Sequence, residues 1–533
     1  MSRNHERAAP APETAPGAEA ATPLRPLVTA ALVALALHLA VRAVLAYQGS
    51  FFASEDDPYR AYLAYLVRFR DAEGLVGRLW LPGGHLLLGA VQLLGVSAAW
   101  AGPVVNTLAT ALLVAGTAVL GTEVAPPPQR RASGWAAVLL VAASPMTIRL
   151  AQSALADLLC GACVVCACAG LARGVRRHRL APLGAGGAFL LAATGLRYEA
   201  WILALLYPFA AVLLARRAGA TRARLVGVVA LTLLPLVGPG AWLAAQRAAH
   251  GDALVFWRAA NAIARDLGGG SSRVGLVLDR CHALLSWAPA VLGWALAAVV
   301  LARRSRAARG PVALAATLLL VAVLPAVVTG HDHPVFPERL AYLAELGLVP
   351  LAAVGLAGLV GRADVRRWVR VGAIGVSVAL GVLALVRPAA MWDHDSVAVG
   401  LALRRGQLRL PPGALLVERP VGRPPFGWAS VGVLWGQWAR TVFATPHEGG
   451  WKLVEPGDVV RGRTVVAADT LGAWLDRRGV VGAWVVSREG AQAVRGAWPR
   501  AAALPLGRGI FFTRGQSPAR GAGPAPSSTG AEP

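Results

Sequence analysis

Three acidic residues stand together soon after the first long apolar segment of the chain, in the sequence FFASEDDPYRAYLAYLVRFRD. They are Glu55, Asp56 and Asp57. A carboxylate within hydrogen-bond reach of a hydroxyl can take its proton as a general base. Two close carboxylates raise each other's pKa unless an arginine or a metal ion compensates their charge. Asp56 and Asp57 are therefore candidates for acid–base chemistry, and a solvated turn at Asp57-Pro58 is the alternative.

Further ionisable residues lie at the ends of apolar segments. They are His85, Asp157, Arg197, Glu199, His331, His333, Glu338 and Arg339. Ionisable side chains at membrane depth are costly and are usually functional. Several of these residues also have a non-functional explanation that involves only their own helix or a neighbouring residue. Asp157 could be stabilised by the dipole of a helix that it opens, by about 0.3–1 kcal/mol. Arg197 and Glu199 could pair with each other, and Arg339 could reach from a helix end to the membrane surface.

The sequence GHDHPVFPER offers a candidate metal site. His331 and His333 flank an aspartate, and imidazole with carboxylate suits zinc or manganese. A histidine pair in a metal-free loop is the alternative, and His85 is either a third ligand or a surface residue. The four cysteines of CGACVVCAC, residues 160–168, lie in an apolar segment and point in different directions on one helix. That placement argues against both a metal cluster and a disulfide.

The composition indicates a polytopic membrane protein. Of 533 residues, 56% are hydrophobic and 15% are charged, whereas soluble domains average about 25% charged residues. The net charge of +24 does not indicate nucleic-acid binding, because the arginines stand in short runs between apolar segments. Such runs are typical of membrane topology signals.

A membrane-spanning helix needs about 20 apolar residues. Eleven segments are predicted to cross: 27–47, 102–121, 134–150, 154–172, 181–196, 200–215, 225–244, 283–301, 311–329, 340–360 and 370–387. Five basic loops should be cytoplasmic: 126–131, 173–179, 216–224, 302–310 and 361–370. Their alternation places the polar residues named above on the outer face, and it makes residues 80–97 a helix that does not cross. A twelve-span protein with one basic loop outside is the alternative.

The ends of the chain differ from this region. Residues 1–26 and 515–533 are predicted to be disordered, the former in the cytoplasm. Residues 388–514 contain short apolar runs, GALLVERP, TVVAADT, GVVGAWVVSRE and GRGIFFTR, which are typical of strands, and TLGAWLDRRG, which is typical of a helix. We therefore predict a small extracytoplasmic α/β domain after a transmembrane domain of residues 27–387.

The order of these motifs resembles the GT-C membrane glycosyltransferases, most of all the protein O-mannosyltransferase and aminoarabinose-transferase group of glycosyltransferase family 39. The resemblance covers roughly residues 27–387. It is carried by five stretches in sequence: EDDPYRAYLAYLVR, LWLPGGHLLLGAVQLLG, SPMTIRLAQSALADLLCG, ATGLRYEAWILALLYP and HPVFPERLAYLAELGLVP.

This resemblance implies an all-α transmembrane fold and transfer of a sugar from a polyprenyl phosphate to an acceptor outside the cytoplasmic membrane. It assigns the base to Asp56 or Asp57, a second functional acid to Asp157, and contact with the donor phosphate to Arg339. It places the remaining polar residues in the substrate site: Glu338, Arg197, Glu199 and His85. Some members hold a divalent metal ion, for which His331 and His333 are the candidates here.

The implied partners are the donor lipid, the bilayer and an acceptor that is a protein, a lipid or a glycan, with no nucleic acid. Two other classes compete with this hypothesis. A transporter is disfavoured because its polar residues would gather at the midplane of inverted repeats, and no such repeat is visible. A non-catalytic envelope-assembly protein would need no buried carboxylates.

Overall fold

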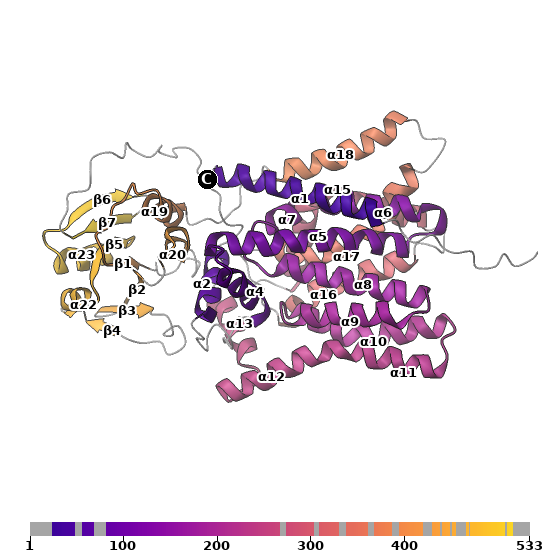
Figure 1. Ribbon diagram of the computed structural model, residues 1–533, viewed down its shortest axis with the longest axis horizontal. Coiled ribbons are helices and arrows are strands. Elements are labelled where there is room, and N and C mark those ends of the chain that lie inside the picture. The colour runs from indigo at the N-terminus through magenta and orange to yellow at the C-terminus, as the bar shows by residue number, and fades with distance from the viewer. Residues whose placement is uncertain are drawn as a thin grey trace, which may run out of the picture.

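The computed structural model describes residues 24–47, 56–68, 81–266, 273–302, 309–329, 337–360, 367–385, 394–418, 429–437, 440–447, 450–454, 465–467, 470–506 and 509–514. A long helical bundle is followed by a domain built on a sheet (Figure 1). The tails predicted to be disordered lie outside the described residues, except for Leu24 to Pro26, which begin the first helix.

The bundle consists of α1 Leu24–Tyr47, α2 Asp56–Arg68, α4 Pro82–Leu93, α5 Ala98–Val124, α6 Arg130–Ala142, α7 Pro145–Leu150, α8 Asp157–Arg176, α9 Leu180–Thr194, α10 Glu199–Arg217, α11 Arg222–Leu233, α12 Val237–His250, α13 Val255–Asp266, α14 Arg273–Trp287, α15 Pro289–Ala302, α16 Arg309–Thr329, α17 Pro337–Val360 and α18 Arg367–Leu385. Short 3₁₀ turns, η1 Pro127–Gln129 and η2 Leu234–Leu236, precede α6 and α12.

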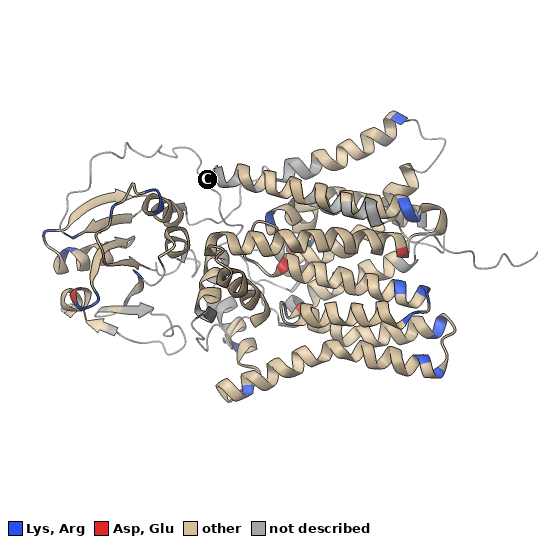
Figure 2. Ribbon diagram, in the orientation of Figure 1, with Lys and Arg blue, Asp and Glu red and all other residues tan. Residues whose placement is uncertain are grey.

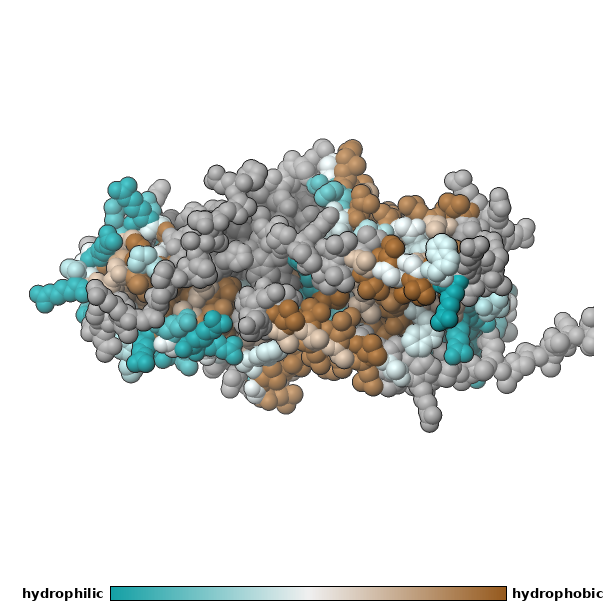
Figure 3. All heavy atoms as spheres, turned by 90° about the horizontal axis from the view of Figure 1, so that it is seen from above, coloured by the Kyte–Doolittle hydropathy of each residue, from teal (hydrophilic) through white to brown (hydrophobic). Residues whose placement is uncertain are grey.

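Within the described residues, five helical stretches are long and apolar enough to cross a membrane. They are α5, α8, α10, the joined α11–α12 and residues 341–360 of α17. A sixth is added if the bent pair α14–α15 counts as one span. Large apolar side chains such as Leu108, Phe209 and Val226 are exposed on the bundle, and Figure 3 shows apolar surface on one face of the bundle. The protein is thus a multi-pass membrane protein, and the count of eleven spans stays a prediction.

Two predicted spans are broken by proline. Segment 134–150 is divided into α6 and α7, because Pro145 begins a new helix whose first turn is capped by the Ser144 hydroxyl, which accepts from the Thr147 N–H. Segment 283–301 is bent by 102° between α14 and α15, where Pro289 begins α15. Proline lacks an N–H and restricts the residue before it, so a helix commonly breaks there. The loop between the predicted spans 225–244 and 283–301 carries α13 and much of α14.

The segment predicted not to cross contains α4. Twelve residues span about 18 Å as a helix, which is too short for a hydrocarbon core of about 30 Å. The N–H of Gly83 donates to the Gly195 carbonyl over 2.9 Å. A Cβ at Gly83 would lie 2.6 Å from that oxygen, so only glycine allows this approach. α4 is therefore fixed against the turn between α9 and α10.

The sheet domain has seven strands: β1 Ala414–Glu418, β2 Thr441–His447, β3 Gly450–Val454, β4 Val465–Ala467, β5 Val480–Val485, β6 Ala502–Leu506 and β7 Gly509–Thr513. Their order is β4-β3-β2-β1-β5-β7-β6. The central strand β1 is parallel to β2 and β5, and the other pairs are antiparallel. The four predicted strands and the predicted helix, α22 Leu471–Arg477, are present. The mixed sheet confirms the predicted α/β character of this region.

The sheet packs against the bundle through α2. One buried cluster joins Tyr62 and Leu63 of α2 to residues of β1, β2 and the helices α19 His394–Arg404 and α20 Ala429–Trp435. The rings of Tyr62 and Phe443 meet edge to face, with centroids 6.3 Å apart. The opposite face of the sheet is covered by α22 and α23 Arg488–Ala497. The helix that begins with Asp56 and Asp57 is therefore held between the bundle and the sheet domain.

Candidate active site

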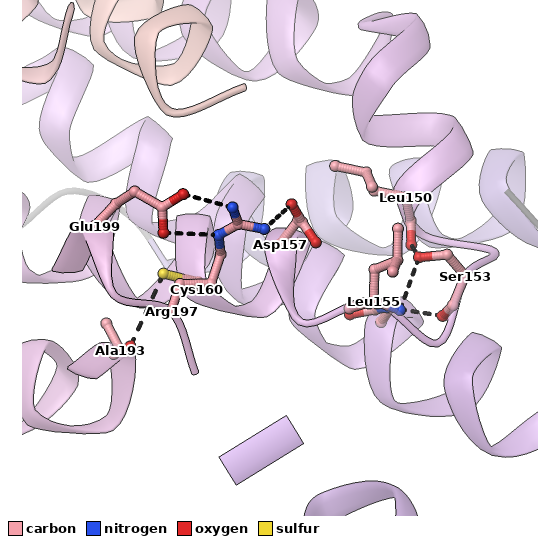
Figure 4. A network of polar contacts seen from close by, with 9 residues as sticks. Leu150, Ser153, Leu155, Asp157, Cys160, Ala193, Arg197 and Glu199 are labelled. Atoms are coloured by element: carbon pink, nitrogen blue, oxygen red, sulfur yellow. Dashed lines mark hydrogen bonds and ion pairs between the residues drawn. The ribbon is translucent and has the colours of Figure 1, made fainter. Parts of the chain in front are cut away.

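A buried guanidinium group lies between two carboxylates at the end of the bundle nearest the sheet domain (Figure 4). Arg197, in the turn between α9 and α10, donates from Nε to Glu199 Oε2 over 3.1 Å and from Nη2 to Glu199 Oε1 over 2.5 Å. Its Nη1 donates to Oδ1 of Asp157. The side chains of Asp157 and Arg197 are 2% and 14% exposed. One positive charge is thus shared by two acids in a site largely closed to water.

Asp157 is fixed by the segment that leads into α8. Asn106 of α5 donates from its Nδ2 to the carbonyls of Ser153, at 2.8 Å, and Leu155, at 2.9 Å. The Ser153 hydroxyl donates to the Leu150 carbonyl and accepts from the Leu155 N–H. These bonds satisfy a buried irregular backbone, which is tolerated at membrane depth only when protein covers it. The first residue of α8 is therefore held in one position.

Aromatic side chains cluster at the start of α10, next to Arg197 and Glu199 in the sequence. The rings of Tyr198 and Phe256 are stacked with centroids 4.5 Å apart, and Trp201 meets Phe256 edge to face at 5.6 Å. The indole N–H of Trp201 donates to the Thr194 carbonyl. Helix α13, which carries Phe256, thereby covers the start of α10.

The charges in this network depend on each other. Burial alone lowers the pKa of the Arg197 guanidinium, but Asp157 and Glu199 outweigh burial and raise that pKa above its usual value. Arg197 therefore stays charged at any physiological pH. Both oxygens of Glu199 accept from Arg197, so this acid positions the guanidinium rather than serving as a free base.

The candidate acids Asp56 and Asp57 are the first two residues of α2. Pro58 follows within the first turn, where a helix tolerates proline, so the turn proposed as the alternative is the start of a helix. Arg60, one turn later, is buried. It belongs to the side of α2 that packs on α4, since a Cβ on Gly84 would lie 3.8 Å from its Nη1.

His85 is a buried residue of α4, and its interpretation as a surface residue is wrong. It is 2% exposed, on a helix that packs against α2. Burial and, to a smaller extent, the charge of Arg60 lower the pKa of His85 to about 3. The imidazole is therefore neutral at physiological pH. In the described part of the chain its Nδ1 has no hydrogen-bond partner.

The start of α17 lies beside the start of α8. Glu338 and Arg339 are its second and third residues. One turn later the buried Tyr342 shares a hydrogen bond of 3.0 Å with Thr147 of α7. A Cβ at Gly161 of α8 would lie 3.2 Å from the Tyr342 ring. Both helices thus begin at the end of the bundle that carries Asp157.

Comparison with known proteins bears on the fold. No family model matches the chain, and no curated protein matches it. The structure of ArnT from Cupriavidus metallidurans bound to undecaprenyl phosphate is similar, with a TM-score of 0.56 and 15% identity over 94% of this chain and 99% of that chain. The apo structure of the same protein gives a TM-score of 0.50 with 15% identity, covering 85% of this chain and 92% of that chain.

The chain has a GT-C-like fold. The similarity extends over nearly the whole chain, including the sheet domain, and it confirms the resemblance drawn from the sequence at the level of fold.

Within the GT-C-like fold, α4 brings the candidate residues together. It packs on α2, and it also reaches Gly195, two residues before Arg197, and Ala156, the residue before Asp157. His331 and His333 lie outside the described residues, and the side chains of Asp56, Asp57, Glu338 and Arg339 are likewise not described. The sequence reasoning missed Arg60, although it stands four residues after Asp56, and it missed Asn106, although it is polar within an apolar span.

Two cysteines of α8 contact different neighbouring helices. Cys160 faces the Ala193 carbonyl of α9 at 4.0 Å, and Cys166 faces the Leu112 carbonyl of α5 at 3.8 Å. These contacts lie on different sides of α8, as the sequence predicts. The described residues contain no group of three or more histidine, cysteine or acidic side chains that could hold a metal ion.

Proposed function

We propose that this protein is an integral membrane glycosyltransferase that moves a sugar from a polyprenyl phosphate to an acceptor on the outer face of the cytoplasmic membrane. The observation that carries the proposal is the similarity of 94% of the chain to ArnT in a structure that holds undecaprenyl phosphate. The buried network of Asp157, Arg197 and Glu199 supports it, because the acids expected from the sequence begin helices at the same end of the bundle.

The proposed reaction requires a base for the acceptor hydroxyl and a positive charge for the leaving phosphate. The acceptor hydroxyl loses its proton to a carboxylate and attacks the anomeric carbon of the sugar, and the bond to the phosphate oxygen breaks. Asp56 is the proposed base, with Asp57 as the alternative, because the resemblance assigns the base to this acidic pair and a carboxylate within hydrogen-bond reach of a hydroxyl can take its proton. The polyprenyl phosphate that leaves carries negative charge. Arg339 is proposed to bind it, since a guanidinium donates two parallel hydrogen bonds to phosphate.

The described network has the role of positioning. Arg197 is held by Glu199 through two hydrogen bonds and by Asp157 through one, which leaves it a rigid, charged wall beside α4. We assign Asp157 the second functional acid position and Arg197 with Glu199 the substrate-binding wall. Glu338 and the neutral His85 complete the proposed substrate site. A divalent ion, if one is required, is assigned to His331 and His333.

A transfer assay tests this function. Membranes that contain the protein are incubated with radiolabelled sugars linked to undecaprenyl phosphate, using glucose, mannose, galactose, arabinose and aminoarabinose donors in turn. The proposal predicts label in a protein, lipid or glycan fraction for at least one donor, and none when the same sugars are supplied as nucleotide sugars to membranes that lack polyprenyl phosphate. Absence of transfer from every lipid-linked donor, with the protein folded in the membrane, would refute the assignment.

A further inference from the structure

The end of the bundle away from the sheet domain carries a buried acid surrounded by arginines. Glu123, in the last turn of α5, has a side chain only 2% exposed. Arg176 Nη2 lies 2.5 Å from its Oε2, and the Nε atoms of Arg173 and Arg177 each lie 3.9 Å from its Oε1. The three arginines stand three and four residues apart at the end of α8, so they share one face. We call these four residues the Glu123 cluster.

The charges in this cluster do not balance. Three guanidinium groups face one carboxylate. The carboxyl ends of α5 and α8 add about half a negative charge each, which still leaves an excess of positive charge. The stretches that surround the cluster, 121–135, 170–180 and 214–226, contain no other acid and seven further arginines. Figure 2 shows this concentration of basic residues at the far end of the bundle.

The arginines lie where a lipid headgroup would be. α5 and α8 are both candidate membrane spans that end at Val124 and Arg176, so the cluster stands at a boundary of the apolar surface. The arginine side chains are 34%, 23% and 21% exposed, in contrast to the buried Glu123. Their outer atoms are therefore accessible, while the acid holds their inner atoms from within the bundle.

We propose that the Glu123 cluster binds the phosphate group of an anionic phospholipid. Basic pockets between membrane-spanning helices suit such headgroups, and a guanidinium matches the geometry of a phosphate. Glu123 orients the arginines, because an acid in the last turn of its own helix is disfavoured by the helix dipole and has these arginines as counter-charges. The site lies at the opposite end of the bundle from the proposed active site and does not depend on the proposed function.

An internal lock between α5 and α8 is the competing explanation, in which the arginines serve only to neutralise Glu123. The two explanations differ in the effect of Glu123→Gln. A lock loses stability that no lipid restores. If the cluster is a lipid site, Glu123→Gln leaves three arginines without their acid. The variant should then be less stable than the wild type in neutral lipid and should gain more stability than the wild type from anionic lipid.

The test measures thermal unfolding of the full chain in a neutral detergent with added phosphatidylcholine, phosphatidylglycerol or inorganic phosphate. We expect phosphatidylglycerol to raise the unfolding temperature by several degrees, and inorganic phosphate at the same concentration to have little effect. The double variant Arg173→Gln/Arg177→Gln should lose the shift. Arg216→Gln/Arg217→Gln is the matched control, since it removes the same charge from the same end without touching Glu123, and it should keep the shift.

Three results would overturn the proposal. They are no difference between phosphatidylglycerol and phosphatidylcholine in the wild type, a full shift in Arg173→Gln/Arg177→Gln, and a shift caused by inorganic phosphate alone. If the Arg173→Gln/Arg177→Gln protein does not fold, Glu123→Gln decides instead, because a shift no larger than that of the wild type indicates the lock.

Discussion

Replacement of Arg197 by glutamine probes the best-defined part of the candidate site. The change removes three hydrogen bonds and leaves Asp157 and Glu199, two largely buried carboxylates, facing each other without a counter-charge. Removal of one partner from a buried ion pair costs about 3–5 kcal/mol. Because Arg197 is 14% exposed and Glu199 is 15% exposed, we expect the lower end of that range, about 3 kcal/mol. Stability should be partly regained at pH 5, where protonation removes buried negative charge.

The matched variants separate charge from packing. The triple variant Asp157→Asn/Arg197→Gln/Glu199→Gln has no charge left in this network, so most of the lost stability should return. Its gain over Arg197→Gln measures the cost of leaving the two carboxylates without a counter-charge. Sugar transfer should remain impaired in the triple variant, because the charged wall is absent.

The assay is thermal unfolding at a fixed heating rate, followed by tryptophan fluorescence in neutral detergent. Arg216→Gln serves as the control for loss of an exposed arginine. A loss of about 3 kcal/mol lowers the unfolding temperature by about 5 °C in this large chain, since domains of about 150–250 residues shift by about 2–4 °C per kcal/mol and larger ones by less. If Arg197→Gln unfolds at the same temperature as Arg216→Gln, the network is solvated and the reasoning on burial is wrong.

Three further predictions follow from single positions. Because the pKa of His85 is lowered in the folded chain, the unfolded chain binds a proton more readily than the folded chain below about pH 6.5. Stability should therefore fall as the pH drops from 6.5 toward 3. In the same unfolding assay, His85→Asn should reduce this dependence of stability on pH. Arg339→Lys should lose most transfer activity at normal protein levels, because lysine keeps the charge but cannot donate two parallel hydrogen bonds as a guanidinium does. Near-normal transfer by this variant would mean that Arg339 serves only as a membrane anchor. Cysteines introduced at Ser54 and at the exposed Gln407, with Cys281 replaced, should both react with an impermeant reagent added from outside, and labelling of only one would contradict the eleven-span topology.

The order and type of most helices could be predicted from apolar length alone. The two breaks could not, because a single proline in an apolar segment either kinks or ends a helix, and the outcome depends on neighbours such as the Ser144 cap. In the sheet domain, β2, β3 and β6 were not predicted, and β2 and β6 each contain a proline. Pro505 is tolerated because β6 is an edge strand.

The sequence also predicted that the candidate residues lie at ends of apolar helices, but not their contacts. Arg197 stands 40 residues from Asp157, and no local pattern joins them, since their distance depends on how α4, α8 and α9 pack. The burial of His85 has the same origin, because Arg60 and α2 cover it only after the bundle forms. Sequence periodicity can place a residue at a helix end, whereas the partner of that residue is decided by tertiary packing.

The central claim is that a carboxylate at the start of α2 takes the acceptor proton. The most direct measurement compares sugar transfer from a radiolabelled polyprenyl-phosphate sugar in membranes that contain the wild type, Asp56→Asn, Asp57→Asn or Glu55→Gln. Loss of a general base typically lowers the rate by about 10²–10⁴-fold. We predict that loss for Asp56→Asn, in turnover rather than in donor affinity, and a mild effect for Glu55→Gln. Transfer at near wild-type rates in both aspartate variants would contradict the account.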